Sequence, residues 1–267
     1  MDNRPIGIFD SGVGGLTVAS QVIKQLENEE IVYFGDTARV PYGNKSKEII
    51  TKFSCQDVRF LLSKNVKAVI IACNTASANS LDDLINKFDV PVFGVVVPGA
   101  KEAVRVTQNQ KVGIIATIGT VRSDAYKKAI NIVNANVQVY SKACPLFVPL
   151  AEEGWANEEI TRLTAEKYLK ELIEKGVDTV VMGCTHYPLL RQCLQSVVGN
   201  EVRLVDPAYE TAMAIKEYLV KNNMLRVAET KPQHSFFVSD TTDMFEKICS
   251  KALEKRYSTE EIDIESY

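Results

Sequence analysis

Cys73 and Cys184 differ from the other cysteines of the chain in what surrounds them. Each directly follows a short apolar run, Val69–Ala72 for the first and Val180–Gly183 for the second. Each also has a threonine within two residues. A cysteine that ends a strand and begins a helix lies near exposed backbone N–H groups, which favour the thiolate and lower the pKa of the thiol. Two halves of similar design that face each other would bring both thiols into one cleft as acid/base groups.

Racemisation at an α-carbon is a reaction that needs two such groups. It removes a proton from one face of the carbon and returns a proton to the other, and one base cannot readily reach both faces. The reverse reaction exchanges the two roles, so two groups of the same type suit it. The α-proton is a weak acid, and the carbanion therefore needs hydrogen bonds aimed at the carboxylate. Candidate donors are Ser11, Asn74, Thr75 and Thr185, together with backbone N–H groups at helix starts.

The elements that must position these residues alternate between strands and helices. The expected strands are Ile6–Phe9, Ile31–Gly35, Ala68–Ala72, Pro91–Val97, Lys111–Ala116, Val137–Tyr140, Thr179–Met182, Arg203–Val205 and a final one at Ser235–Val238. Helices are expected from the glycine-rich turn to about Leu26, over about Ser46–Lys64, Arg122–Val133 and Asn157–Lys175, from the segment Cys73–Ser77 onward and from about Ala208 onward. Cys144–Gly154 is expected to be a loop. Unbroken apolar strands that alternate with helices indicate parallel sheets covered on both faces.

Polar residues collect at the ends of these expected strands. In open parallel sheets, ligands bind beyond the carboxyl ends of the strands. The residues at those ends are Asp10-Ser11, Asp36 with the Tyr42-Gly43 loop, Cys73-Asn74-Thr75, Thr117 and Cys184-Thr185-His186. We expect His186 to hydrogen-bond to Cys184 or exchange protons with it, and Asp10 to do the same for Cys73.

Composition and charge exclude several other classes of protein. The net charge is −3 and the basic residues are scattered, so neither nucleic acid nor an anionic membrane is an expected partner. No secretory segment or long apolar run is present, so we expect a cytoplasmic protein. The two histidines have no metal-site spacing and the six cysteines form no CxxC, so we expect no metal. Cys55, Cys193 and Cys249 are expected to pack inside helices.

Four segments, taken together and in order, resemble the glutamate racemase family within the aspartate/glutamate racemase superfamily. They are Ile6–Val18, the segment from Gly35-Asp36 to Pro41-Tyr42-Gly43, Ala72–Ala76 and Gly183–Leu190. They extend from residue 6 to residue 190, and no functional position departs from the pattern.

This resemblance implies interconversion of L- and D-glutamate without pyridoxal phosphate or another cofactor, supplying D-glutamate for bacterial peptidoglycan. It implies Cys73 and Cys184 as the two acid/base groups. Residues that hold the substrate or tune the thiols would be Asp10, Ser11, Tyr42, Gly43, Asn74, Thr75, Thr185 and His186. Glu152 resembles a family carboxylate that lies beside the second cysteine and His186.

The resemblance also implies two pseudo-symmetric α/β domains, each a mostly parallel sheet flanked by helices, with the active site in the cleft between them. We expect residues 1–97 plus 207–267 to form the first domain, which carries Cys73. Residues 98–206 would form the second, which carries Cys184. The family further implies a homodimer.

Other functions are open at this stage. A nucleotide-dependent enzyme would use Gly12–Gly15 and Asp36, but Thr17 stands where a dinucleotide-binding fingerprint needs its third small residue. A cysteine hydrolase would use Cys184 with His186, or Cys73 with Asp10, and would leave the other cysteine segment without a purpose. A racemase of the same superfamily that acts on aspartate or another acid, and a binding module without catalysis, are further alternatives.

Overall fold

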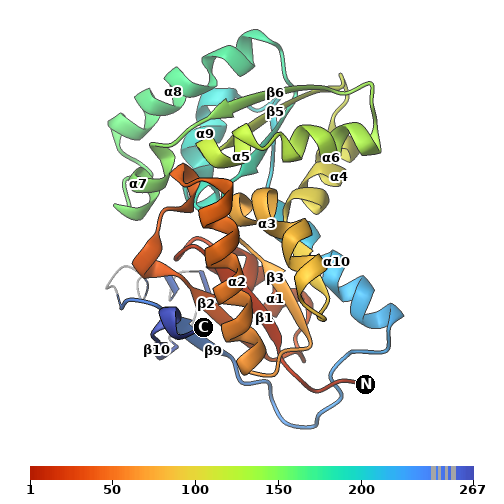
Figure 1. The fold of residues 1–267 in the computed structure, drawn as a ribbon. Helices are drawn as coiled ribbons and strands as arrows, with labels where there is room; N and C mark the ends of the chain where they lie inside the picture. The colour runs from red at the N-terminus through yellow and green to blue at the C-terminus, as the bar shows by residue number, and fades with distance from the viewer. Residues whose placement is uncertain (242–244, 246–247, 250–251, 254–256) are drawn as a thin grey trace.

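The chain folds into two lobes, each built on one sheet (Figure 1). The computed structural model describes residues 1–241, 245, 248–249, 252–253 and 257–267. One sheet has six strands in the order β10-β9-β2-β1-β3-β4, and the other has four in the order β6-β5-β7-β8. All the described strand pairs are parallel. The expected fold class, α/β with two parallel sheets flanked by helices, is confirmed.

The bounds of the elements are as follows. The six-stranded sheet contains β1 (Ile6–Asp10), β2 (Ile31–Gly35), β3 (Ala68–Ile71), β4 (Val92–Gly94), β9 (Ser235–Val238) and β10 (Thr259–Glu261). The four-stranded sheet contains β5 (Lys111–Ala116), β6 (Gln138–Ala143), β7 (Thr179–Gly183) and β8 (Arg203–Val205). The helices are α1 (Leu16–Gln25), α2 (Lys47–Ser63), α3 (Asn74–Lys87), α4 (Val96–Val106), α5 (Ile118–Arg122), α6 (Ala125–Val133), α7 (Phe147–Glu152), α8 (Glu159–Glu174), α9 (Arg191–Val198) and α10 (Pro207–Lys221).

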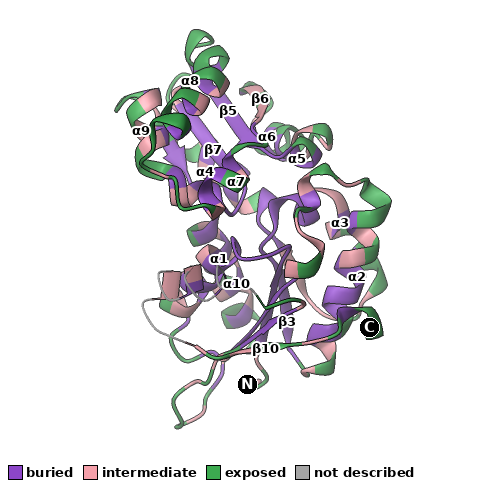
Figure 2. Ribbon diagram, turned by 90° about the vertical axis from the view of Figure 1, so that its left-hand side faces the viewer, coloured by how far each residue is buried: buried purple, intermediate pink, exposed green. Residues whose placement is uncertain are grey.

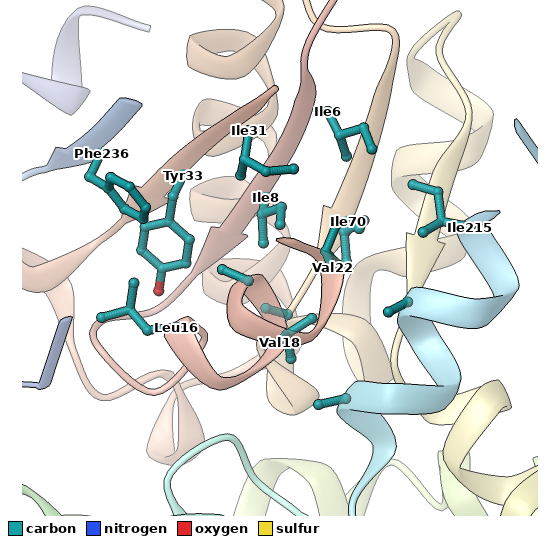
Figure 3. Close-up of a cluster of buried hydrophobic side chains, with 14 of the residues drawn as sticks. Ile6, Ile8, Leu16, Val18, Val22, Ile31, Tyr33, Ile70, Ile215 and Phe236 are labelled. Atoms are coloured by element: carbon teal, nitrogen blue, oxygen red, sulfur yellow. The ribbon is translucent and has the colours of Figure 1, made fainter. Parts of the chain in front are cut away.

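Helices cover both faces of the central strands, which is why those strands are apolar along their whole length. Every residue of β1, β2 and β3 is buried, and Figure 2 shows this buried interior beneath partly exposed helices. On one face, Ile8 and Ile70 of the sheet pack against Val22 of α1 and Ile215 of α10 (Figure 3). Each such fully buried aliphatic side chain stabilises the fold by about 2 kcal/mol relative to an exposed one.

The end of the chain returns to the lobe in which it began. Strand β9 pairs with β2, and β10 pairs with β9, so both termini lie in the lobe with the six-stranded sheet (Figure 1). The boundaries 1–97 plus 207–267 and 98–206 stay a prediction, and parts of 207–267 lie outside the described residues. No helix in the described part of the chain is long and apolar enough to cross a membrane.

Two expectations about secondary structure were wrong for the same physical reason. Pro91–Val97 was expected to be one strand, but β4 ends at Gly94 and α4 begins at Val96. Cys144–Gly154 was expected to be a loop, but it contains α7. Pro98 and Pro149 are each the third residue of a helix, where the backbone N–H that proline lacks would have had no partner within the helix.

Smaller corrections concern element ends. The helix expected over Arg122–Val133 begins at Ala125 as α6, after Asp124 in a left-handed conformation with φ of 56°, and the short helix α5 that precedes it was not expected. Ser235–Val238 is not the last strand, since β10 follows it. Helix α9 was not expected at all. The strand expected at Val137–Tyr140 runs over Gln138–Ala143. This strand is half exposed, so the run of apolar residues that marks a buried strand is short here.

Candidate active site

A small cavity lies where the carboxyl ends of strands from both sheets meet. Its volume is about 20 Å³. It is lined by Ser11, Val40, Pro41, Tyr42, Gly43, Cys73, Asn74, Thr75, Thr117, Val148, Cys184, Thr185 and His186. Nine of the residues predicted from the sequence are therefore brought together at one place. A cavity of this size holds about one water molecule, so an amino acid enters only when the walls move apart.

Cys73 lies at the end of β3 and caps the start of α3. Its sulfur accepts a hydrogen bond from the N–H of Ala76 at 3.5 Å and donates one to Ser11 Oγ at 3.5 Å. Burial and the negative charge of Asp10 nevertheless raise the pKa of Cys73 to about 12, against the lowering effect of these hydrogen bonds. The thiol is therefore protonated at neutral pH. The expectation that the helix start would lower the pKa of this thiol was wrong, because burial outweighs it.

Asp10 is fully buried at the end of β1 and contacts the other lobe. One carboxylate oxygen accepts a hydrogen bond from the N–H of Gly12 at 3.1 Å, and the other accepts one from Thr185 Oγ1 at 3.3 Å. Burial raises the pKa of Asp10, although the positive charge of His186 opposes this. No hydrogen bond joins Asp10 to Cys73 among the described residues. Asp10 therefore acts on that thiol through its charge.

The glycine-rich turn after β1 is filled by side chains from the second lobe. A Cβ atom on Gly14 would lie 2.4 Å from Thr185 Oγ1 and 2.7 Å from His186 Nδ1. Glycine is therefore required for this close approach. A turn occupied in this way has no room to cradle a phosphate, which counts against the nucleotide-binding alternative.

Cys184, at the end of β7, is followed by a histidine that connects it to a carboxylate. His186 Nδ1 lies 3.9 Å from Cys184 Sγ, and His186 Nε2 lies 3.0 Å from Glu152 Oε1 on α7. Burial alone would lower the pKa of His186, but hydrogen bonds to Cys184 and Glu152 and their charges raise it to about 10. The imidazole therefore carries a second proton at neutral pH. The doubly protonated imidazole donates through Nε2–H to Glu152 and has Nδ1–H on the Cys184 side, so His186 can donate a proton to a Cys184 thiolate.

The Tyr42-Gly43 loop lines the cavity, and its tyrosine hydroxyl is bonded within the first lobe. The Tyr42 hydroxyl donates to carboxylates of Asp36 and Asp57, the latter at 3.1 Å. Arg39 binds the same two carboxylates at 2.7 and 3.1 Å. A Cβ on Gly43 would lie 2.7 Å from Thr117 Cβ, so glycine lets the loop close against the start of α5.

The sequence interpretation missed several residues that shape the cavity. Thr117 stood out as a strand-end residue but was given no role. Its hydroxyl lies 2.9 Å from that of Thr75 and 3.0 Å from that of Thr120, so a trio of hydroxyls joins the lobes. Thr120, three residues after Thr117, fits the spacing of a helix cap and was detectable on that basis. Val148 carried no signal, because it lies in the helix expected to be a loop.

Metal ligands are not gathered at this site or elsewhere in the part of the chain that the structure describes. No group of three or more histidine, cysteine, aspartate or glutamate side chains there is arranged to hold a metal ion.

Known racemases resemble this chain over most of its length. The family model for Asp/Glu/Hydantoin racemase matches residues 16–215. A glutamate racemase of Geobacter metallireducens is 50% identical over 250 residues, covering 94% of this chain and 93% of that protein. The solved structure of a Francisella tularensis glutamate racemase in complex with D-glutamate is 38% identical, covers 100% of both chains and superposes with a TM-score of 0.94. A Bacillus anthracis glutamate racemase structure, 37% identical over 98% of both chains, gives the same TM-score of 0.94.

Proposed function

The chain belongs to the Asp/Glu/Hydantoin racemase family, and on this premise we propose that it interconverts L-glutamate and D-glutamate. The family resemblance expected from the sequence is thereby confirmed. The relatives that are 50% and 48% identical over nearly the whole chain are glutamate racemases, which favours glutamate over aspartate as the substrate. Isomerisation at the α-carbon is the reaction that the two facing thiols suit best.

The single observation that carries this proposal is the placement of one cysteine from each lobe on a shared cavity. Cys73 comes from the end of β3 and Cys184 from the end of β7. A substrate held between them would present opposite faces of its α-carbon to the two sulfurs, as inversion requires.

The proton transfers follow from the different surroundings of the two thiols. In one direction, Cys184 as the thiolate takes the α-proton, and the electron pair of the broken C–H bond stays on the α-carbon. Cys73, which its raised pKa keeps protonated, then gives its proton to the opposite face. Cys73 is left as the thiolate and Cys184 as the thiol. Proton exchange of the two sulfurs with water, in which Cys184 loses a proton and Cys73 gains one, restores the starting state.

Hydrogen-bond donors would stabilise the carbanion by binding the substrate carboxylate. Ser11, Asn74, Thr75 and Thr185 line the cavity and supply such groups, and the backbone N–H groups at the start of α3 add to them. Donors fixed in place before the reaction cost no reorganisation when the charge develops. We propose that this arrangement acts without a cofactor.

The family resemblance also supports three wider proposals. D-glutamate made by this enzyme would be supplied to bacterial peptidoglycan synthesis. The protein would act in the cytoplasm as a homodimer. We further propose that the two lobes correspond to domains of residues 1–97 plus 207–267 and 98–206.

Incubation of dialysed protein with pure L- or D-glutamate in D2O, without added cofactor, tests the reaction. We expect optical rotation to fall to zero while deuterium enters the α-position, measured by polarimetry and by loss of the α-proton NMR signal. Rotation that persists with folded protein would contradict the proposal. Loss of rotation with aspartate but not glutamate would assign the enzyme to the other substrate, and dependence on added pyridoxal phosphate would exclude the thiol mechanism.

A further inference from the structure

Tyr126 reaches from the second lobe to the residue beside Cys73. It lies on α6, is 2% exposed, and its hydroxyl is 2.5 Å from Asn74 Oδ1 at the start of α3. Asn74 itself lines the cavity and is 4% exposed. Neither the sequence motifs nor the mechanism above uses Tyr126.

The length of this hydrogen bond identifies which end of the Asn74 amide faces the tyrosine. A separation of 2.5 Å lies within the range of O–H···O bonds and is too short for an N–H···O bond. Burial raises the pKa of Tyr126, so the hydroxyl keeps its proton and donates it. The accepting atom is therefore the amide oxygen, and Nδ2 is on the other branch of the side chain.

The two N–H groups of Asn74 Nδ2 are left for a ligand. No protein acceptor in the described part of the chain takes a hydrogen bond from this nitrogen, although Asn74 lines the cavity. If the amide turned over, its oxygen would replace these donors. A partial negative charge would then face the place where the substrate carboxylate and the carbanion must be bound.

The tyrosine ring is buried in an apolar cluster and lies beside two glycines. A Cβ atom on Gly183 would lie 3.1 Å from the Tyr126 ring, and one on Gly99 would lie 3.4 Å from it. Gly183 directly precedes Cys184, so the ring lies between the two cysteine segments. Side chains at these two glycines would press on the ring, so glycine leaves the space in which the Tyr126 hydroxyl reaches Asn74.

We propose that Tyr126 is a positioning residue, which holds the oxygen of Asn74 so that the amide N–H groups point at the substrate carboxylate. This inference rests on the proposed glutamate racemisation. Because the hydroxyl comes from the second lobe and Asn74 from the first, the donor is oriented only while the lobes are together. Thr75 and Asn79 of α3 also bond across the same boundary, to Thr117 and Gly119.

The first test is the Tyr126→Phe variant, which keeps the ring and removes only the hydroxyl. We expect kcat/KM for glutamate to fall about tenfold, as expected when a buried polar group loses its partner. The fall should be equal for both enantiomers, which have equal free energies in water. Tyr187→Phe is the matched control, since the Tyr187 hydroxyl is equally buried and donates to the Cys144 carbonyl at 2.8 Å. It should lower the unfolding temperature similarly while kcat/KM changes less than about twofold.

A double-mutant cycle shows whether Tyr126 acts through Asn74. In the Asn74→Ala background, Tyr126→Phe should change kcat/KM less than about twofold, because the amide that it orients is already absent. A full tenfold loss in that background would overturn the proposal, and so would an unchanged kcat/KM in the single variant.

A measurement without turnover separates this inference from the proposed function. The Asn74 side-chain NH2 signal in a ¹⁵N NMR spectrum, assigned by its loss in Asn74→Asp, should shift in Tyr126→Phe and not in Tyr187→Phe. Wild-type protein that is inactive on glutamate would refute the function, whereas an unmoved amide signal would refute the positioning role. If Tyr126→Phe does not fold, Asn74→Asp retains the acceptor and lacks the donors. It should bind D-glutamate at least about tenfold more weakly by calorimetry, and unchanged binding would overturn the proposal.

Discussion

The two cysteine sites have the same position in their sheets but different chemical surroundings. Each cysteine follows a buried parallel strand and is itself buried, with 5% of Cys73 and 6% of Cys184 exposed. Cys73 begins a helix of 14 residues, bonds to Ser11 and lies near the charge of Asp10. Cys184 is followed instead by a short 3-10 turn, and its partner is the His186–Glu152 pair.

This comparison shows that strand-end position alone does not determine the protonation of a thiol. At Cys73, burial and the Asp10 charge outweigh the N–H groups of α3 and keep the proton on sulfur. At Cys184, a protonated imidazole lies beside the sulfur and can exchange a proton with it. One site is therefore built to hold a proton and the other to pass one on.

Replacement of either cysteine should remove racemisation. In Cys73→Ala and in Cys184→Ala, we expect the rate to fall at least about 10³-fold, because one face of the α-carbon loses its acid/base group. Each variant should retain slow α-proton exchange in D2O with one enantiomer, and the two variants should retain it with opposite enantiomers. Cys193→Ala, at a half-buried cysteine of α9, is the control and should be fully active. Exchange of the same enantiomer by both variants would disprove the facing arrangement.

Removal of the Asp10 charge should change the Cys73 site specifically. In Asp10→Asn, the pKa of Cys73 should fall below about 12, because the negative charge that disfavours the thiolate is gone. The pH dependence of iodoacetamide alkylation reports this, measured in the Cys184→Ala background with and without the Asp10 change. Racemisation should fall about 10²-fold, since Asp10 also bonds to Thr185. A pKa that is unmoved or raised would show that Asp10 does not set the state of this thiol.

Removal of the Glu152 charge should change the other site. In Glu152→Gln, the pKa of His186 should fall below about 10, since the carboxylate helps to stabilise the imidazolium. The wild-type imidazole loses its proton as pH rises through about 10, so the alkaline limb of the kcat profile should move to lower pH in the variant. We expect kcat to fall about tenfold. Glu153→Gln, at the exposed neighbouring glutamate, should leave the limb in place.

The smallest effect should come from the outer end of the network that holds the Tyr42-Gly43 loop. Glu265 binds Arg39 at 3.1 Å, but its side chain is 62% exposed. An exposed ion pair contributes about 0 to 1 kcal/mol, so Glu265→Gln should change the KM for glutamate less than about threefold. Asp57→Asn, at the fully buried end of the same network, should raise the KM more. The reverse order would mean that the C-terminal segment, not the buried carboxylates, positions the loop.

Much of this site was predictable from sequence because its residues follow apolar strands. Asp10, Cys73, Thr117 and Cys184 all come directly after runs that could only be buried strands, and parallel strands place their ends on one edge. The family resemblance added Glu152, which lies beside His186 as that resemblance implied. Its catalytic role remains a proposal.

What the sequence could not predict depended on contacts between distant elements. The raised pKa of Cys73 follows from its burial in the folded chain and from the charge of Asp10, and no local pattern reports either. Tyr126 and Asp57 are single polar residues inside helices, and only the packing shows that they are buried beside the site. Helices α4 and α7 were missed because a proline near a helix start resembles a break in structure.

The position of the isotope after a brief reaction in D2O tests the two-thiol mechanism most directly. The thiol that removes the α-proton carries that same proton. When it gives the proton back to the same face, the starting enantiomer is re-formed with hydrogen, not deuterium, at its α-carbon. The opposite thiol has exchanged with solvent, so the product receives deuterium. When a few per cent of L-glutamate has turned over, chiral separation and mass spectrometry should find deuterium in the D-glutamate and almost none in the recovered L-glutamate, and the same in reverse from D-glutamate. Equal deuterium in product and recovered substrate at the earliest times would contradict a mechanism with one thiol on each face.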